Sequence, residues 1–170
     1  LGALGRAAWV TIVIGTLGSL LGAALGLPLG VLAARNLGAG SAVHWLSKLL
    51  LDASRSVHTL VFGLILVGIV GLGPTAGILA IGLHSMGTYG KLYAESIETL
   101  DMAAIEAVRA VGASPLQIFF NAIWPAVVPQ WLSSHLYIWE YNVRDSTVLG
   151  LIGAGGLGAL ISEAISLFQW

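Results

Sequence analysis

Residues 105–125 read IEAVRAVGASPLQIFFNAIWP, with charged side chains early in the run and Gly112-Ala113-Ser114-Pro115 in the middle. Glycine commonly follows the end of a helix and proline fits a first helical turn, so this order predicts a helix, a break and a second helix. Ser114 and Gln117 have the spacing of a capping box, which places the start of the second helix at Pro115. A polar hairpin between apolar segments indicates a surface that meets a partner in water.

The composition places the chain among membrane proteins. Of its 170 residues 57% are hydrophobic and 9% are charged, and its mean hydropathy is +0.92, whereas soluble domains carry roughly 25% charged residues. The 23 glycines suit close helix packing in lipid. The absence of cysteine excludes disulfides and thiolate sites, and the net charge of −1 gives no indication of nucleic-acid binding. Because the chain begins at Leu1, we expect it to be part of a longer protein.

Apolar runs predict an all-α, polytopic transmembrane bundle that forms a single domain over residues 1–170. A membrane span needs about 20 apolar residues, and the candidate spans are residues 7–34, 46–70, 75–93 and 126–151. Pro28 is expected to kink the first span. Residues 44–55 are amphipathic and are expected to lead into the second span. Gly71-Leu72-Gly73-Pro74 predicts the turn before the third span.

The polar section between the third and fourth spans has helical periodicity. Ile97, Leu100, Ala104, Val108 and Val111 recur at helical spacing, with Glu95, Glu98, Glu106 and Arg109 on the opposite side. This pattern predicts one amphipathic helix that ends at Gly112, within a coupling region over residues 95–125. Pro125 is expected to open the fourth span. Lysine and arginine are commoner in cytoplasmic loops, which places residues 36–55 and 91–125 on the cytoplasmic side.

The hairpin resembles a cytoplasmic signature of the permease subunits of bacterial ABC importers. That signature combines Glu-Ala-Ala, a following glycine and a hydrophobic stretch that ends in Leu-Pro. Here it reads Glu106-Ala107-Val108, Gly112 and Trp124-Pro125. Val108, Ala122 and Trp124 depart from the usual Ala, Ile and Leu but stay small or apolar.

The resemblance implies that the hairpin docks on a separate ATPase subunit as a helix in a groove. The residues to which it assigns coupling are Glu106, Ala107, Arg109, Gly112, Ser114, Pro115 and Pro125. That ATPase would bind ATP and magnesium, so this chain is expected to be no enzyme and to hold no catalytic residue, cofactor or metal. The alternative is a helix lying on lipid headgroups, but such helices carry basic polar faces and this one is net acidic.

A wider set of segments is similar to the permeases of phosphonate, phosphite and phosphate importers. They include Ala34-Arg35-Asn36-Leu37, Leu83-His84-Ser85-Met86-Gly87, Gly90-Lys91-Leu92, Asn142-Val143-Arg144 and Ser146-Thr147-Val148-Leu149-Gly150. The resemblance implies a multi-pass protein of the bacterial cytoplasmic (inner) membrane. Its partners would be ATPase subunits, a periplasmic or lipid-anchored substrate-binding protein, a second permease copy in a homodimer, and membrane lipid, but no nucleic acid. A permease for methionine or an osmoprotectant, a self-contained channel or secondary transporter, and a membrane anchor remain alternatives.

The outer half of the fourth span holds a polar cluster. Ionisable residues at membrane depth commonly face a bundle interior or a wet cavity, so a transport pathway would be lined by Asn142, Arg144, Asp145, Ser146 and Thr147. Arg144 offers a bidentate fork to a phosphonate-like anion. The alternative for Arg144 is a structural i,i+4 ion pair with Glu140.

Glycines follow this cluster in a turn over residues 150–158, namely Gly153, Gly155, Gly156 and Gly158. Three of them match the spacing G-x-G-x-x-G, but a dinucleotide site also needs a preceding strand, a βαβ unit and a later acidic residue. Those features are missing from the sequence. We therefore interpret the glycines as a turn, or an unwound helix end, beside a gate.

Overall fold

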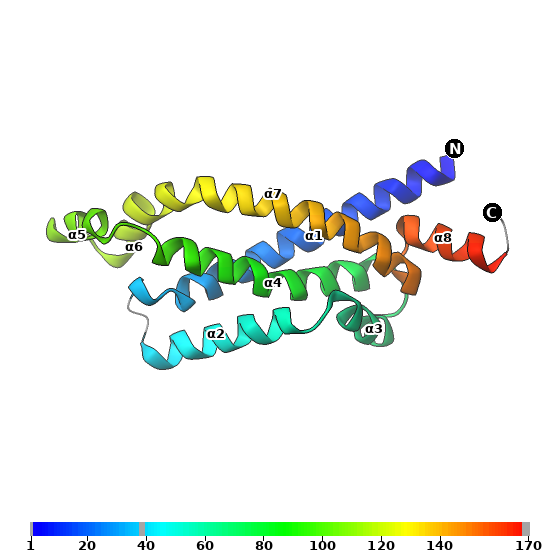
Figure 1. Ribbon diagram of the computed structural model, residues 1–170, viewed down its shortest axis with the longest axis horizontal. Coiled ribbons are helices and arrows are strands. Elements are labelled where there is room, and N and C mark those ends of the chain that lie inside the picture. The colour runs from blue at the N-terminus through cyan, green and yellow to red at the C-terminus, as the bar shows by residue number, and fades with distance from the viewer. Residues whose placement is uncertain (1, 38–39, 168–170) are drawn as a thin grey trace.

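The computed structural model describes residues 2–37 and 40–167, and within them all regular secondary structure is helical. The α-helices are α1 (Gly2–Ala33), α2 (Ser41–Ser56), α3 (Thr59–Val70), α4 (Pro74–Glu98), α5 (Met102–Ala110), α6 (Pro115–Ile118), α7 (Trp124–Leu149) and α8 (Gly156–Ser166). Figure 1 shows an elongated bundle with α5 and α6 at one end and α3 and α8 at the other. The all-α prediction is confirmed, and residues 1, 38–39 and 168–170 of the predicted single domain lie outside the described residues.

Helix α4 is the centre of the bundle, and α1 packs along it more extensively than any other pair of helices. The contact uses glycines of α1 that recur every fourth residue, at Gly18, Gly22, Gly26 and Gly30. A side chain on Gly26 would approach the backbone of Met86 and Gly90 within 3.0 Å. Small residues thus let the two backbones meet directly, as the glycine-rich composition predicts.

The candidate span at residues 46–70 is not one straight helix, because α2 and α3 are separate helices bent by 89°, although the two together are long and apolar enough for one span. The break lies at Val57 and His58, both in extended conformation. It is stabilised locally: the carbonyl of Val57 accepts a hydrogen bond from His84 Nδ1 at 2.8 Å, and His58 Nδ1 caps α3 by accepting from Leu60 N. Hydrophobic periodicity alone does not reveal such a bend, since both halves are helical.

The amphipathic helix predicted across residues 91–111 is also interrupted. Helix α4 continues to Glu98, and Asp101 then begins α5 as its N-cap by accepting from Ala103 N at 2.9 Å. Glu95 and Glu98 therefore belong to α4, not to the hairpin. The side chain of Ala104, which was assigned to the apolar face, lies outside the described residues.

The second hairpin helix continues directly into α7. A π-helical turn at Phe119–Ile123 joins α6 to α7, so the helical chain runs without a break from Pro115 to Leu149. Pro125 lies in the first turn of α7, one residue after its start, close to the predicted opening of the fourth span. Helix α1 likewise continues through Pro28 as one helix.

Among the described residues, α1 alone is by itself long and apolar enough to cross a membrane, and counting each bent pair as one span raises the number to three. The predicted span at residues 75–93 lies within α4 but does not meet that measure. The lower hydropathy of α4 has a structural reason. Helix α4 is packed against α1, α2, α3 and α7, so it does not need an apolar surface on every side. Only its lipid-facing neighbours must be apolar.

Candidate coupling hairpin and transport surface

The hairpin is stabilised by two local features that the sequence predicts, a helix cap and a glycine turn. The capping box at the start of α6 is formed: Gln117 N donates to Ser114 Oγ at 3.4 Å, and Ser114 N donates to Gln117 Oε1 at 2.8 Å. Gly112 has φ +82°, which favours glycine, and its N–H donates to Arg109 O at 3.0 Å. The break between α5 and α6 is therefore a defined turn.

The hairpin turns one side to the bundle and the other outward. Ile105, Ile118 and Ile123 are buried against the core, whereas Val111 is 83% and Leu116 70% exposed. The predicted coupling residues are all exposed; they are Glu106, Ala107, Arg109, Gly112, Ser114, Pro115 and Pro125. Glu106 and Arg109 make no salt bridge with any described residue. Exposed apolar and charged groups together at one tip are typical of a protein-docking surface.

An aromatic stack leads from the hairpin into the bundle between α4 and α7. Its ring centroids lie 6.0 Å apart for Phe119–Trp124, 5.8 Å for Trp124–Trp131, 4.5 Å for Trp131–Tyr93, 5.8 Å for Tyr93–Tyr89 and 5.2 Å for Tyr89–His135. These separations fall in the range of favourable aromatic pairs. This stack could not be predicted from the sequence, because Tyr89 and Tyr93 lie on α4 and the other rings lie on α7 and the π-helical turn before it, far away in the chain.

The structure divides the predicted pathway residues into two groups. Asn142 is 1% exposed: its Nδ2 donates to Ser19 Oγ at 2.7 Å, and its Oδ1 accepts from Ser85 Oγ at 3.0 Å. Ser146 is fully buried and donates to the carbonyl of Thr11 at 2.9 Å. These two residues join α7 to α1 and α4, so they stabilise helix packing in this structure and do not face an open pathway.

The remaining three residues lie at the surface of α7. Arg144 is exposed and paired with Glu140 in an i,i+4 ion pair, while Asp145 and Thr147 are half-buried. Asp145 Oδ2 is buried without a hydrogen-bond partner among the described residues. A shallow groove between α1 and α7 is lined by Arg144 and Thr147 together with Trp139. Arg144 thus pairs with Glu140 on its own helix and also borders this groove.

The glycine turn stabilises the end of the bundle opposite the hairpin. Gly153, Gly155 and Gly156 have positive φ values of 105°, 89° and 72°, and Gly158 is buried against the backbone of Gly150. Gly73 N donates to Gly153 O at 2.9 Å, and Leu157 N donates to Thr11 Oγ1 at 2.9 Å. The turn therefore ties α7 and α8 to α1 and to the loop before α4.

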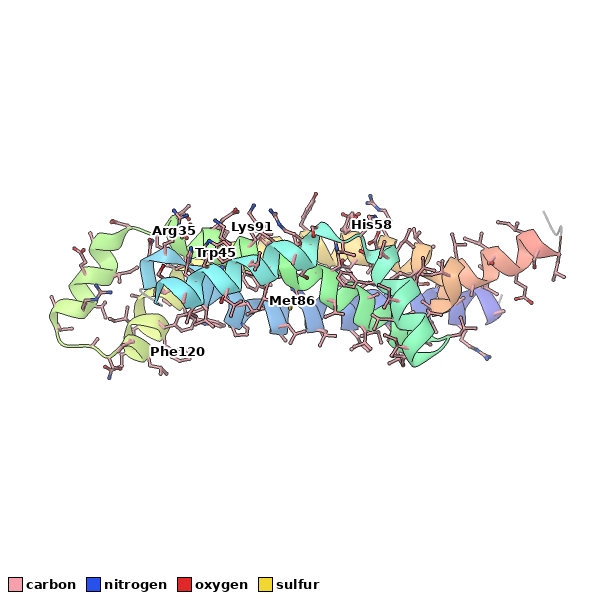
Figure 2. All side chains as sticks on the ribbon, turned by 90° about the horizontal axis from the view of Figure 1, so that it is seen from below. Arg35, Trp45, His58, Met86, Lys91 and Phe120 are labelled. Atoms are coloured by element: carbon pink, nitrogen blue, oxygen red, sulfur yellow. The ribbon has the colours of Figure 1, made fainter. Side chains whose placement is uncertain are left out.

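Helices α2 and α4 share a polar surface that was not predicted from the sequence. Lys48, Asp52 and Arg55 on α2 face the side of α4 that carries Lys91 and Glu95, around a cavity of about 200 Å³. Figure 2 shows Arg35, Lys91 and His58 along one edge of the molecule. The spacing of polar residues within each helix was a signal available in the sequence.

Comparison with known proteins identifies the family. Residues 26–169 match the family model described as binding-protein-dependent transport system inner membrane component, and the chain belongs to this family. It is 41% identical to a phosphite transport system permease protein of Stutzerimonas stutzeri, over 98% of this chain and 62% of that protein. It is 40% identical to a phosphate-import permease protein of Mycolicibacterium smegmatis, over 94% of this chain and 30% of that protein. The chain thus spans less than two thirds of the length of these relatives.

Solved structures show the same fold. The chain superimposes on a chain of an inward-facing MetNI methionine ABC transporter with a TM-score of 0.88, covering 96% of this chain and 81% of that one. The sequence identity is 24%, so the similarity extends to the fold alone. The expected resemblance to importer permeases is confirmed.

Proposed function

We propose that this chain belongs to the membrane-spanning subunit of an ATP-driven importer that passes phosphite, phosphonate or a related phosphorus oxyanion. The observation that carries the proposal is the hairpin of α5 and α6, which presents exposed apolar and charged side chains at one end of the bundle. The named relatives, which transport phosphite and phosphate, support the solute class. A separate binding protein delivers the solute from outside.

The proposed assembly contains two copies of the subunit and two ATPases in a bacterial inner membrane, with each chain crossing it several times. The interior between α1, α4 and α7 is filled by buried side chains, which supports a pathway between copies. The ATPases bind ATP and magnesium. Their closure pulls the two hairpins together, and the unbroken helix from α6 into α7 carries that movement into the membrane.

Reversal of the charge at Glu106 is expected to weaken association with the ATPase at least about tenfold, or about 1.4 kcal/mol. Glu106 is exposed on the docking surface and makes no salt bridge with a described residue, so its carboxylate is available to a partner cation. The measurement is co-purification of the ATPase with the Glu106→Lys permease from detergent-solubilised membranes.

Glu163→Lys is the matched control, because Glu163 is also exposed but lies on α8 at the other end of the bundle. Its ATPase association should equal that of the wild type. Equal ATPase recovery with wild type, Glu106→Lys and Glu163→Lys would remove the hairpin from the docking interface.

Arg144 is proposed to face the solute pathway near its outer end. Removing its charge by Arg144→Gln should lower phosphite uptake at limiting concentration about fivefold, the effect of roughly 1 kcal/mol between unit charges at contact in water. Uptake into vesicles that contain the ATPase and binding protein provides the measurement. Unchanged uptake by Arg144→Gln would reduce the Arg144–Glu140 contact to a structural ion pair.

A further inference from the structure

The α2–α4 groove, which we define by Lys48, Asp52, Arg55, Lys91 and Glu95, begins near the hairpin end and runs inward between the two helices. It encloses a cavity of about 200 Å³, enough for several water molecules. A second cavity continues past Arg55 and Asp52 to His84 and Thr88. The polar surface therefore extends along α2 and α4 from Lys91 to His84.

The polar residues of α4 form one continuous stripe. They are His84, Thr88, Lys91, Glu95 and Glu98, each three or four residues from the next. At 1.5 Å per residue the stripe extends about 21 Å along the helix, which is roughly two thirds of a hydrocarbon core of about 30 Å. Lys91, Glu95 and Glu98 belong to the section placed on the cytoplasmic side, whereas His84 and Thr88 lie within the predicted third span. Polar and ionisable side chains inside a span commonly face the interior of a protein or a water-filled cavity, which disfavours lipid as the neighbour of this inner part of the stripe.

Helix α2 separates two environments. Lys48, Asp52 and Arg55 face the groove, whereas Leu46, two residues before Lys48 and so on the other side of the helix, is 57% exposed. Helix α2 also packs on α1 and α4. Its exposed apolar side can therefore face lipid while its polar side faces water. The same helix therefore marks the boundary of a wet space.

The charges in the groove leave positive groups available. Asp52 is paired with Arg55 at 3.1 Å and Glu95 with Lys91 at 3.5 Å, while Glu98 Oε1 accepts from the backbone N of Arg35 at 3.0 Å. Each carboxylate thus has a partner. In contrast, Lys48 makes no salt bridge with a described residue. The buried Nδ1 of His44, which also lines the groove, has no hydrogen-bond partner among the described residues.

We propose that the α2–α4 groove is the water-filled inner part of the transport route and that a phosphorus oxyanion passes along it, with Lys48 as an anion contact. This inference rests on the proposed function and assigns the route to residues that no motif indicated. Arg35, Lys48, Arg55 and Lys91, four of the seven lysines and arginines of the chain, lie around this groove. Figure 2 shows Arg35 and Lys91 on the same edge of the molecule.

Cysteine accessibility tests the groove directly, because the chain contains no cysteine. Single variants Lys48→Cys and Thr88→Cys report on two depths of the groove, and Leu46→Cys reports on the exposed apolar flank of α2. The complete transporter, with its ATPase and binding protein in vesicles, is treated from the cytoplasmic side with a negatively charged methanethiosulfonate reagent. Both groove cysteines should react at least about tenfold faster than Leu46→Cys, and saturating phosphite should slow both reactions.

Two outcomes would overturn the inference. Reaction of Thr88→Cys no faster than that of Leu46→Cys would restrict water to the level of the lipid headgroups, even if Lys48→Cys reacts. Fast reaction of both cysteines without protection by phosphite would show a wet groove that the oxyanion does not enter. Phosphite uptake by the wild-type vesicles is measured in parallel, so that failure of the groove and failure of the proposed function are distinguished.

Discussion

Replacing Gly26 by alanine is expected to destabilise the bundle by about 3 kcal/mol, at the upper end of the usual cost of overpacking. A Cβ at Gly26 would lie 2.8 Å from Met86 O and 2.9 Å from Gly90 N. Both atoms are backbone atoms of α4, so no change of rotamer can relieve the contact and the two helices must separate. The measurement is the thermal midpoint of the purified transporter, with the amount of assembled complex in membranes as a second readout.

Gly68→Ala adds the same methyl group to another helical glycine, on α3, where a Cβ would meet no atom within 4 Å. This control should be neutral or should stabilise the protein by about 0.5 kcal/mol, since alanine restricts the unfolded chain more than glycine does. Gly26→Ala is therefore expected to lower the stability of the bundle, whereas Gly68→Ala should leave it unchanged or raise it. Equal midpoints for Gly26→Ala and Gly68→Ala would contradict direct backbone contact between α1 and α4.

Replacing Gly112 by proline is expected to abolish uptake while the bundle remains assembled. Proline holds φ near −65° and has no N–H, whereas Gly112 has φ +82° and donates to Arg109 O. Together these losses exceed about 3 kcal/mol at one turn, enough to disorder the connection between α5 and α6. Uptake and ATPase activity stimulated by the loaded binding protein should both fall at least about a hundredfold, or about 2.7 kcal/mol.

Gly40→Pro is the matched control, because Gly40 precedes α2 with φ −47°, close to the value that proline adopts. It should retain uptake. A self-contained channel would tolerate Gly112→Pro, so undiminished solute flux in that variant, with or without the ATPase, would refute the coupling role of the hairpin.

The local features of the hairpin could be predicted from the sequence because they depend on neighbouring residues. Ser114, Gln117 and Pro115 specify a capped helix start wherever that segment lies, and Gly112 specifies a turn. The bend at His58 could not be predicted in the same way. It depends on His84, which lies on a different helix and bonds to the carbonyl of Val57.

The candidate pathway shows the same limit. Polar residues within α7 were treated as one cluster, but successive residues on a helix point in different directions, so Asn142 became buried while Arg144 stayed exposed. Which face of α7 would be covered depends on the glycines of α1 and on Ser85 of α4. The α2–α4 groove likewise requires two helices to be placed side by side, although each of its polar stripes is present in the sequence.

The aromatic stack between α4 and α7 determines how a movement of the hairpin is shared. The ring centroids of Tyr93 and Trp131 lie 4.5 Å apart near the hairpin. We therefore expect α4 and α7 to move together when the hairpin moves. Helix α4 also forms one wall of the α2–α4 groove. The other wall, α2, makes no comparable aromatic contact with the hairpin in the part of the chain that the structure describes. A movement of the hairpin would then change the distance between α2 and α4. Docking at the hairpin and access of solute to the groove would thus depend on the same movement of α4.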